Sequence, residues 1–404
     1  MTTIDKLIEK GVKIANPASI EVGPEVDLDR ISGDGVVIYA GCKIYGQDTL
    51  ILAGARLGYE APVTVDNCRI GPDVELKGGF FQKAVFLKGA KLGLGSHVRE
   101  ATILEEQASI AHTVGLKHTI LLPFVTLGSL INFCDCLMSG GTSRKNHSEV
   151  GSAYIHFNFT PSQDKATASL IGDVPRGVML NQKPIFLGGQ GGLVGPCRLG
   201  FGITVAAGTI VRKNETRSNR LIFGGAGKGG NLAFIPGLFR PDKKIILNNI
   251  IYIGNLIALR QWYHQVRALF LCDDFPEALL LGLKENIDRA IAERIVRLEA
   301  VCRKKPTAGS GKKASAKLQS RQALYRHWPE LRAELESRLA DFGDPALMDP
   351  FLEKIRTEIT DRGKDYLSVI QGLDSADCQI GTRWLQGIVD GVVTETRRIV
   401  PVLA

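Results

Sequence analysis

The sequence lacks the features that mark disulfide-linked or metal-binding proteins. Its eight cysteines are scattered over 404 residues, form no CxxC pair and show no histidine spacing of the zinc-finger kind. The closest two, Cys134 and Cys136, alternate so that both would lie on one face of a strand, where small apolar side chains fit. We therefore expect buried, reduced thiols and no metal site.

The chain also has little that would direct it to a membrane or a nucleic acid. The N-terminal stretch MTTIDKLIEKGVKI has no apolar signal core, and the closest candidate for a membrane span, residues 245–259, contains three asparagines. The formal net charge of +8 is modest for this length, and no aromatic-basic platform accompanies it. These absences predict a cytoplasmic protein with no membrane span and no nucleic-acid partner.

An apolar residue recurs at every sixth position in two stretches of the chain. Neither the helical period of about 3.6 residues nor the alternation of a strand gives such a step. A parallel β-helix of hexapeptide repeats does, because each face of its triangular coil contributes one inward side chain. The two runs are Val74, Phe80, Phe86, Leu92, Val98, Leu104, Ile110, Leu116 and Leu122, and then Leu187, Leu193, Leu199, Val205 and Val211.

Changes in composition divide the chain into parts. We expect a short helix over 1–18, a β-helix over 19–213, a Gly-rich connector over 214–241 and an α-helical domain over 242–404. Glycines are frequent where the coils would turn and positive φ is needed. Within the helical part, residues 304–316 read as a flexible basic loop.

The predicted repeat lapses over residues 140–186, a stretch rich in side chains that ionise, hydrogen-bond or stack. A long excursion from a rigid solenoid is usually functional. It contains two candidate general bases, His147 and His156, since imidazole has the intrinsic pKa for that task. Alternation places Tyr154, His156 and Asn158 on one strand face, which is either a hydrogen-bonded substrate site or the solvent side of the strand.

Basic residues surround the two histidines. They would bind the phosphate of a sugar phosphate or nucleotide sugar, or else belong to a solvated loop. The Gly-rich runs at 188–192 and 224–230 match no Walker pattern and are better explained by coil corners and a connector. The basic residues are Arg144, Lys145, Lys165, Arg176 and Lys183.

Residues 146–211 resemble the acetyltransferase half of the bifunctional N-acetylglucosamine-1-phosphate uridyltransferases, and the related UDP-N-acetylglucosamine pyrophosphorylases. The matching pieces are Asn146-His147, Phe157-Asn158-Phe159, Lys165, Leu170-Ile171-Gly172-Asp173, Leu193-Val194-Gly195-Pro196 and Ala206-Ala207-Gly208-Thr209. The resemblance implies a left-handed β-helix, a homotrimer and acetyl-CoA bound in a groove between neighbouring subunits.

The same resemblance assigns roles to single residues. His147 would be the base that deprotonates a sugar amine, Asn158 would lie near the acyl donor, and Lys165 would approach the sugar phosphate. Gly189 and Ala207 would line the track of the pantetheine arm. The implied function is acyl transfer from acyl-CoA to an amino-sugar phosphate.

The sequence also departs from the family pattern. No tyrosine stands three residues after His147, one coil of the family phrase is shortened, and no Gly-rich nucleotide loop precedes the solenoid. A long helical domain follows instead. The alternative hypothesis is therefore a non-catalytic scaffold or regulatory module, with the helical domain mediating assembly.

Overall fold

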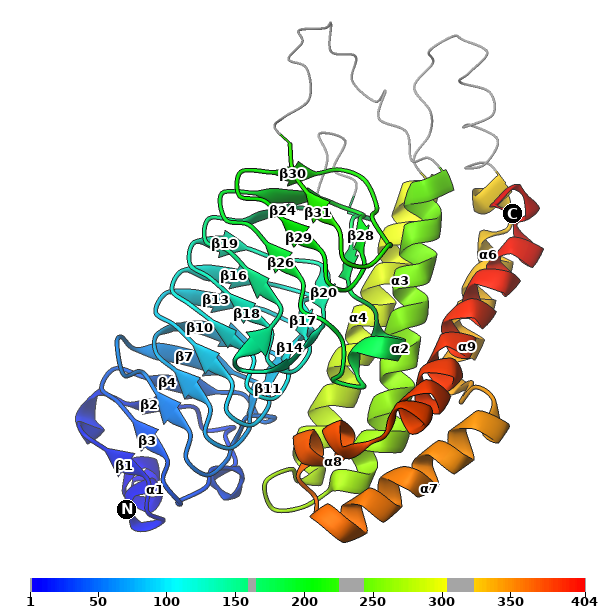
Figure 1. Cartoon of the computed structure of the whole chain (residues 1–404). Helices are drawn as coiled ribbons and strands as arrows, with labels where there is room; N and C mark the ends of the chain where they lie inside the picture. Colours follow the sequence, from blue (N-terminus) through cyan, green and yellow to red (C-terminus); the bar gives the residue numbers. More distant parts are fainter. Residues whose placement is uncertain (1, 159–164, 225–242, 304–322, 404) are drawn as a thin grey trace, which may run out of the picture.

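The computed structural model describes residues 2–158, 165–224, 243–303 and 323–403. Over these ranges the chain forms a left-handed parallel β-helix followed by an all-α region, as the repeat and the resemblance predicted (Figure 1). The expected basic loop at 304–316 and most of the Gly-rich connector lie outside the described residues.

Three parallel sheets form the faces of the solenoid, and each strand pairs with its equivalents in the coils before and after it. Sheet A contains β1 (Lys13–Ile14), β3 (Val37–Ile38), β6 (Arg56–Leu57), β9 (Glu75–Leu76), β12 (Lys91–Leu92), β15 (Ser109–Ile110), β18 (Thr126–Leu127), β23 (Glu149–Val150), β26 (Phe186–Leu187), β29 (Thr204–Val205) and β31 (Leu221–Ile222). Sheet B contains β2 (Glu21–Val22), β4 (Lys43–Tyr45), β7 (Val63–Asp66), β10 (Gly79–Gln82), β13 (Ser96–Val98), β16 (Val114–Leu116), β19 (Ile131–Asn132), β24 (Ile155–Phe157), β27 (Gly192–Val194) and β30 (Ile210–Val211). Sheet C contains β5 (Leu50–Ile51), β8 (Arg69–Ile70), β11 (Ala84–Phe86), β14 (Thr102–Leu104), β17 (Ile120–Leu121), β20 (Cys136–Met138), β25 (Ser169–Ile171) and β28 (Arg198–Leu199).

The apolar residue at every sixth position, referred to below as the six-residue rule, correctly predicts most of the side chains that point into the solenoid. From Phe86 to Leu116, and again from Leu187 to Val211, its members are buried in one continuous interior cluster. The rule is wrong at Phe80, which is half-buried while its neighbour Phe81 points inward. It is wrong again at Leu122, which packs outside the solenoid. Both errors arise because some faces advance by five residues and not six, so the phase slips by one position.

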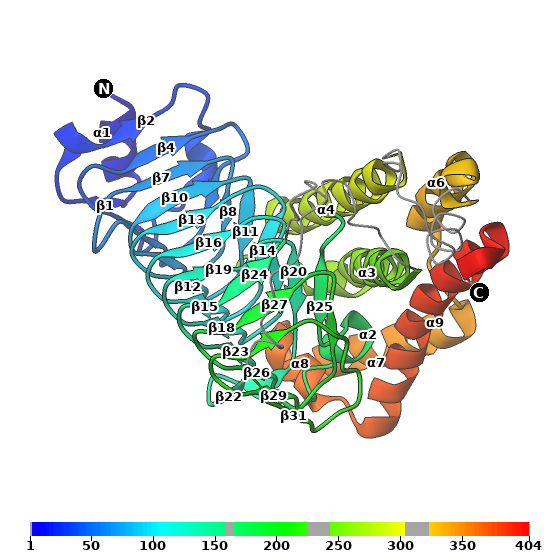
Figure 2. The same ribbon diagram turned by 90° about the horizontal axis from the view of Figure 1, so that it is seen from above.

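Sheet C differs from the other faces because it is apolar on both sides. Its inward residues continue the interior, while Val85, Ile103, Ile120, Leu137 and Leu170 form an outward ladder in register from coil to coil. All five are buried in a second cluster that they share with the helical region. Helices α3 (Lys243–Gln261) and α4 (Glu277–Arg303) lie along this face, and the other long helices pack outside them (Figure 2).

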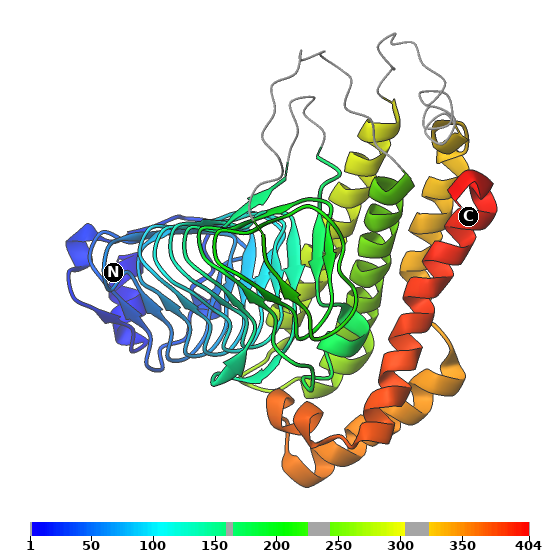
Figure 3. The same cartoon turned by 45° about the horizontal axis from the view of Figure 1, so that its top comes forward.

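The described part of the helical region contains the long helices α3, α4, α7 and α9 and the shorter helices α6 and α8. Helix α3 continues into the turns η3 (Trp262–Val266) and η4 (Arg267–Phe270), and the C-terminus lies among the helices, far from the N-terminus on the first coil (Figure 3). Helix α7 ends at Gly363, whose φ is +77°, after which Asp365 caps α8. The described helices are α1 (Thr3–Glu9), α2 (Val174–Gly177), α3 (Lys243–Gln261), α4 (Glu277–Arg303), α6 (Trp328–Ser337), α7 (Pro345–Arg362), α8 (Tyr366–Gly372) and α9 (Ser375–Ile399).

The repeat does not lapse over residues 140–186, contrary to the expectation. Strands β23, β24 and β25 pair in sheets A, B and C, so the coil continues through this stretch. The additional residues are insertions where the chain passes between sheets. One is the antiparallel hairpin β21 (Gly141–Ser143) and β22 (Asn146–His147), and another contains α2. Among the described helices none is both long enough and apolar enough to cross a membrane.

The coils turn at positions where the backbone has a positive φ, and glycine occupies only some of these positions. Residues such as Asn67, Lys83, Ala101, His118 and Asp135 take the left-handed conformation at successive turns between sheets B and C. Elsewhere glycine is required by contact and not by φ. A Cβ on Gly151 would lie 2.4 Å from the backbone nitrogen of Gly189 in the next coil.

We expect Gly151→Ala to lower the free energy of unfolding by about 1–3 kcal/mol, because two backbones would have to separate. Gly387→Ala is the matched control, since its Cβ would meet no atom within 4 Å on the exposed side of α9. Helix propensity predicts that the control gains up to about 1 kcal/mol. Chemical denaturation measures both variants, and equal stabilities would contradict the coil contact.

Candidate functional site

The candidate site residues predicted from the sequence lie at the three different edges of the solenoid, where the chain passes from one sheet to the next. The C–A edge, where the chain passes from sheet C to sheet A, carries the hairpin with His147 and the insertion with Arg176 and Lys183. Asn158 and Lys165 belong to the B–C edge. Gly189 and Ala207 belong to the A–B edge, so a single chain does not bring the three groups together.

His147 lies on the second strand of the hairpin, partly exposed and held by its own turn. Its Nδ1 is 2.8 Å from the backbone carbonyl oxygen of Arg144. A carbonyl only accepts, so in the neutral ring Nδ1 carries the proton and Nε2 keeps a free lone pair. The Glu149 carboxylate lies 3.6 Å from Nε2, and the His147 side chain is 19% exposed. Gln371 of α8 donates to the carbonyl of Thr142, which ties the hairpin to the helical region.

Arg144 holds this hairpin against the coils. Its Nη1 donates to the backbone oxygens of Gln107 (3.0 Å) and Phe124 (2.9 Å), and its Nη2 donates to Ser109 (3.2 Å). These bonds account for much of its donor capacity and favour a structural role over the predicted phosphate binding. Lys145, next along the turn, is exposed.

A groove of about 680 Å³ adjoins the hairpin on the outer face of sheet A. Arg144 forms part of its wall, together with Ser109 and Thr126. His112 lines the groove where the chain passes from sheet A to sheet B. Lys91 pairs with Glu75 at 3.0 Å within it. The groove is surface-accessible, and its largely apolar lining carries hydroxyl and charged groups in reach of a small molecule.

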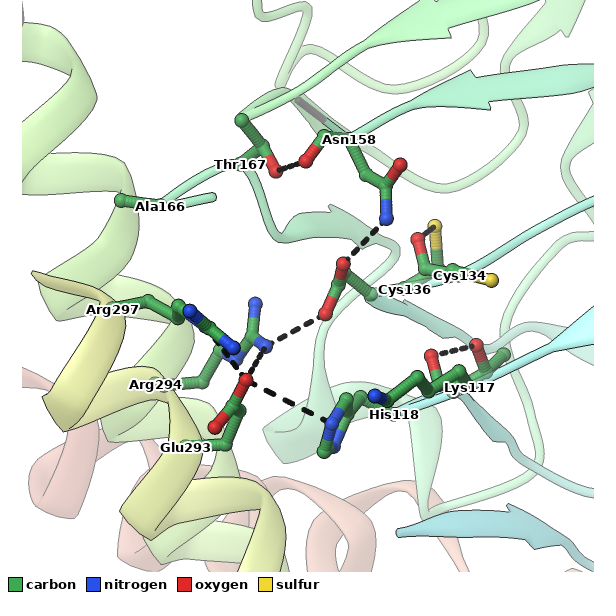
Figure 4. Close-up of polar contacts among 12 residues, drawn as sticks. Lys117, His118, Cys134, Cys136, Asn158, Ala166, Thr167, Glu293, Arg294 and Arg297 are labelled. Atoms are coloured by element: carbon green, nitrogen blue, oxygen red, sulfur yellow. Dashed lines mark hydrogen bonds and ion pairs between the residues drawn. The ribbon is translucent and has the colours of Figure 1, made fainter. Parts of the chain in front are cut away.

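Asn158 is anchored by a network that joins the B–C edge to the helical region (Figure 4). Its amide donates to Asp135 at 2.7 Å, and the other oxygen of Asp135 pairs with Arg294 of α4 at 2.6 Å. Thr167 donates to the Asn158 carbonyl, and Asn249 of α3 donates to the carbonyl of Ala166 at 2.8 Å. Both ends of the 158–167 segment are thus fixed by groups outside it.

His118 completes this network, although its sequence context gave no sign of it. Its Nε2 lies 3.9 Å from Glu293, which also pairs with Arg297 at 2.7 Å. Burial, reinforced by the neighbouring Arg294, lowers the pKa of His118. The one feature of the sequence that could have indicated its role is its spacing: His118 lies 17 residues before Asp135, which is about one coil.

The predicted polar face of Tyr154, His156 and Asn158 is reversed in the structure. Tyr154 and His156 are 0% and 1% exposed and point into the solenoid, while Ile155 and Phe157 are 44% and 39% exposed. The Nδ1 of His156 lies 2.7 Å from the carbonyl of Cys134, and Nε2 lies 2.8 Å from the Ser169 hydroxyl. Burial lowers the pKa of His156 to about 4. A fully bonded, enclosed ring is not positioned as a base for an external substrate.

The remaining candidates have mixed surroundings. Arg176 forms an ion pair with Asp173 and lies 4.9 Å from the ring centre of Phe201. Lys183 donates to Asn219 at 3.0 Å, and Lys165 is exposed. Among the residues that the structure describes, no group of three potential ligands is placed to hold a metal ion.

Gly189 and Ala207 lie one coil apart in a stack of small residues along the A–B edge. Gly189 is half-buried and Ala207 is exposed. A Cβ on Gly188 would lie 2.4 Å from the Ala207 nitrogen, so neighbouring coils approach closely here. The edge consequently has little side-chain bulk and leaves its backbone accessible.

Comparison with known proteins supports the resemblance drawn from the sequence. The bifunctional protein GlmU of Thermotoga maritima is 24% identical over 214 residues, covering 53% of this chain and 42% of that protein. The GlmU of Baumannia cicadellinicola is 26% identical over 250 residues, covering 61% of this chain and 46% of the relative.

This chain is a hexapeptide-repeat β-helix protein that is similar in sequence to part of GlmU. It spans less than half the length of the curated relatives named here. No protein-family model matches it. Among solved structures, the UDP-N-acetylglucosamine acyltransferase of Campylobacter jejuni is 13% identical, covers 52% of this chain and 69% of its own, and has a TM-score of 0.16.

The buried histidine of this β-helix protein generates a prediction about pH. The unfolded state binds a proton to His156 near pH 6.5, whereas the folded state resists protonation down to about pH 4. Stability therefore falls as the pH drops through this window, by about 3 kcal/mol in all. We expect His156→Gln to remove that part of the pH dependence, measured by urea unfolding between pH 7 and pH 4. An unchanged slope in the variant would show that another group is responsible.

The Asp135–Arg294 pair should contribute strongly to stability. We expect Arg294→Met to cost about 3–5 kcal/mol, because it leaves the Asp135 carboxylate buried without its cation. Arg356→Met is the control, since Arg356 and Glu353 form an exposed pair at 3.0 Å, worth at most about 1 kcal/mol. Denaturant unfolding of the two variants compares them, and similar losses would argue against a special role for the buried pair.

Proposed function

We propose that the chain transfers an acyl group from acyl-CoA, acetyl-CoA being the expected donor, to the amino group of an amino-sugar phosphate or nucleotide sugar. The observation that carries the proposal is His147. Its ring is oriented by a backbone carbonyl at 2.8 Å, with Nε2 left unprotonated beside a carboxylate. A general base for amine acylation needs this tautomer and some exposure.

The chemistry follows from that arrangement. His147 Nε2 accepts a proton as the sugar nitrogen attacks the thioester carbon, and the carboxylate of Glu149 stabilises the resulting imidazolium. The C–N bond forms, the C–S bond breaks, and the imidazolium returns its proton to the departing thiolate of CoA. The products are an amide and free CoA.

The acceptor is proposed to lie in the groove on sheet A beside the hairpin, where the Ser109 hydroxyl accepts from Arg144 and keeps its own proton to donate to a sugar hydroxyl. Lys145, exposed on the hairpin, remains a candidate for the phosphate, whereas Lys165 is exposed on the B–C edge, away from this groove. Arg176 and Lys183 have intramolecular partners, so they are weaker candidates than the sequence suggested.

The acyl donor is proposed to run along the A–B edge, past Gly189 and Ala207. Small residues there let a pantetheine arm approach the backbone, whose amides and carbonyls match its own. In one chain this edge is separate from His147. We therefore propose a homotrimer in which the C–A edge of one subunit faces the A–B edge of the next.

The experiment is an acyltransfer assay with acetyl-CoA and glucosamine phosphates or amino nucleotide sugars, detecting free thiol. We expect His147→Ala to lower kcat by about 100-fold or more without changing Tm, because the base is lost and the hairpin remains. His327→Ala is the control, since His327 is 40% exposed in the helical region.

Two outcomes would overturn the proposal. Full activity in the His147 variant would remove its base, and an absence of both activity and acetyl-CoA binding in folded protein would favour the scaffold hypothesis. Sedimentation of the intact chain tests the proposed trimer.

A further inference from the structure

A cavity of about 600 Å³ lies between the solenoid and the helical region, at the C–A edge. The solenoid contributes Glu106 and Gln107, the chain after α3 contributes Arg267 and Phe275, and the start of α8 contributes Tyr366. The cavity adjoins the hairpin, since Arg144 donates to the carbonyl of Gln107. None of the functional predictions from the sequence involves it.

The floor of the cavity is a buried ion pair enclosed by aromatic rings. Arg267 is 1% exposed, Glu106 is 7% exposed, and Nη2 of Arg267 donates to Oε1 of Glu106. The guanidinium carbon lies 3.7 Å from the ring centre of Tyr366 and 4.4 Å from that of Phe275. These contacts hold the guanidinium in one orientation.

The pair leaves complementary polar atoms without partners. Nε and Nη1 of Arg267 and Oε2 of Glu106 have no hydrogen-bond partner within the described part of the chain. Buried donors and acceptors are rarely left unpaired, because each costs about 1–3 kcal/mol. The adjacent Glu105 does not line the cavity; its Oε1 accepts from Tyr263 at 2.6 Å, and its Oε2 is also unpaired within the described residues. The two members of this ion pair therefore keep unpaired donors and an unpaired acceptor at the floor of the cavity.

The charges around the cavity restrict what that molecule is. Arg267 and Glu106 already neutralise each other, so the floor needs no net charge from a ligand. At the rim, four carboxylates (Asp73, Asp273, Asp274 and Asp365) outnumber two ammonium groups (Lys88 and Lys364). This excess disfavours polyanions such as nucleoside triphosphates.

We propose that the cavity binds a small neutral heterocycle with adjacent ring N–H and C=O groups, of the nucleobase or nucleoside type. The ring N–H donates to Oε2 of Glu106, and the ring carbonyl accepts from Arg267. Leu279 and the aromatic walls enclose the apolar faces of the ring. The volume is in the range of small-molecule sites. The proposal is independent of the acyltransferase chemistry.

Calorimetric titration of the full chain with uridine and inosine tests it, because both carry the required N–H and C=O pair. We expect at least one to bind. Its N-methylated counterpart, 3-methyluridine or 1-methylinosine, should bind about 10-fold more weakly or worse, because the donor to Glu106 is lost. UTP should bind more weakly than uridine.

A variant tests the same contact from the protein side. Glu106→Gln keeps an oxygen for Arg267 but replaces the free acceptor with a donor, so we expect about a 10-fold loss of affinity for the bound nucleoside. Glu285→Gln is the matched control, since it weakens the Arg69–Glu285 pair (2.9 Å), which also joins the two regions but does not line the cavity.

The proposal is overturned if neither nucleoside binds at millimolar concentration, or if N-methylation leaves the affinity unchanged. Equal affinities for Glu106→Gln and wild type would also overturn it. The comparison of methylated and unmethylated ligands needs no variant, so it decides the question even where Glu106→Gln unfolds. Nucleoside binding in a protein that shows neither acyl transfer nor acetyl-CoA binding would refute the proposed function alone.

Discussion

The structure depends on stacking each coil directly on the one before it. Parallel hydrogen bonds fix the register, so an inward side chain of one coil meets its equivalent in the next, as Phe86, Leu104 and Leu121 do in sheet C. This column makes the solenoid rigid and forces backbone groups at the edges into close contact. Small residues such as Gly151 are needed there because no space remains for a Cβ.

One face of the solenoid carries a second constraint. Sheet C is apolar outside as well as inside, so it has to be covered, and α3 and α4 cover it. Burying this face also buries charged groups at its edges, and several have a partner on the helical region. Asp135 pairs with Arg294, and Glu106 pairs with Arg267. Packing of the helices thus creates both the network around Asn158 and the cavity floor.

The positions of the candidate sites follow from this difference between the covered sheet C and the exposed sheets A and B. Sheets A and B keep exposed outer surfaces, where the groove and the stack of small residues lie, while insertions at the edges carry the reactive side chains. His147 belongs to an insertion that is held by Arg144 and by α8. A rigid solenoid with anchored insertions holds such side chains in place, and the stacked interior does not have to change.

The sequence by itself determined the β-helix, because apolar residues recur at every sixth position and these residues stack inside the solenoid. It also determined that the later part of the chain is helical. The sequence also indicates that sheet C is buried on both faces, because its strands have two consecutive apolar residues, as in Val85-Phe86 and Ile103-Leu104. The tertiary structure decided the rest. A slip of one residue reverses the face of a strand, so only the register showed that His156 points inward and Ile155 outward. The Arg267–Glu106 pair joins residues 161 positions apart, and no local pattern records a contact that arises from packing the helices on sheet C.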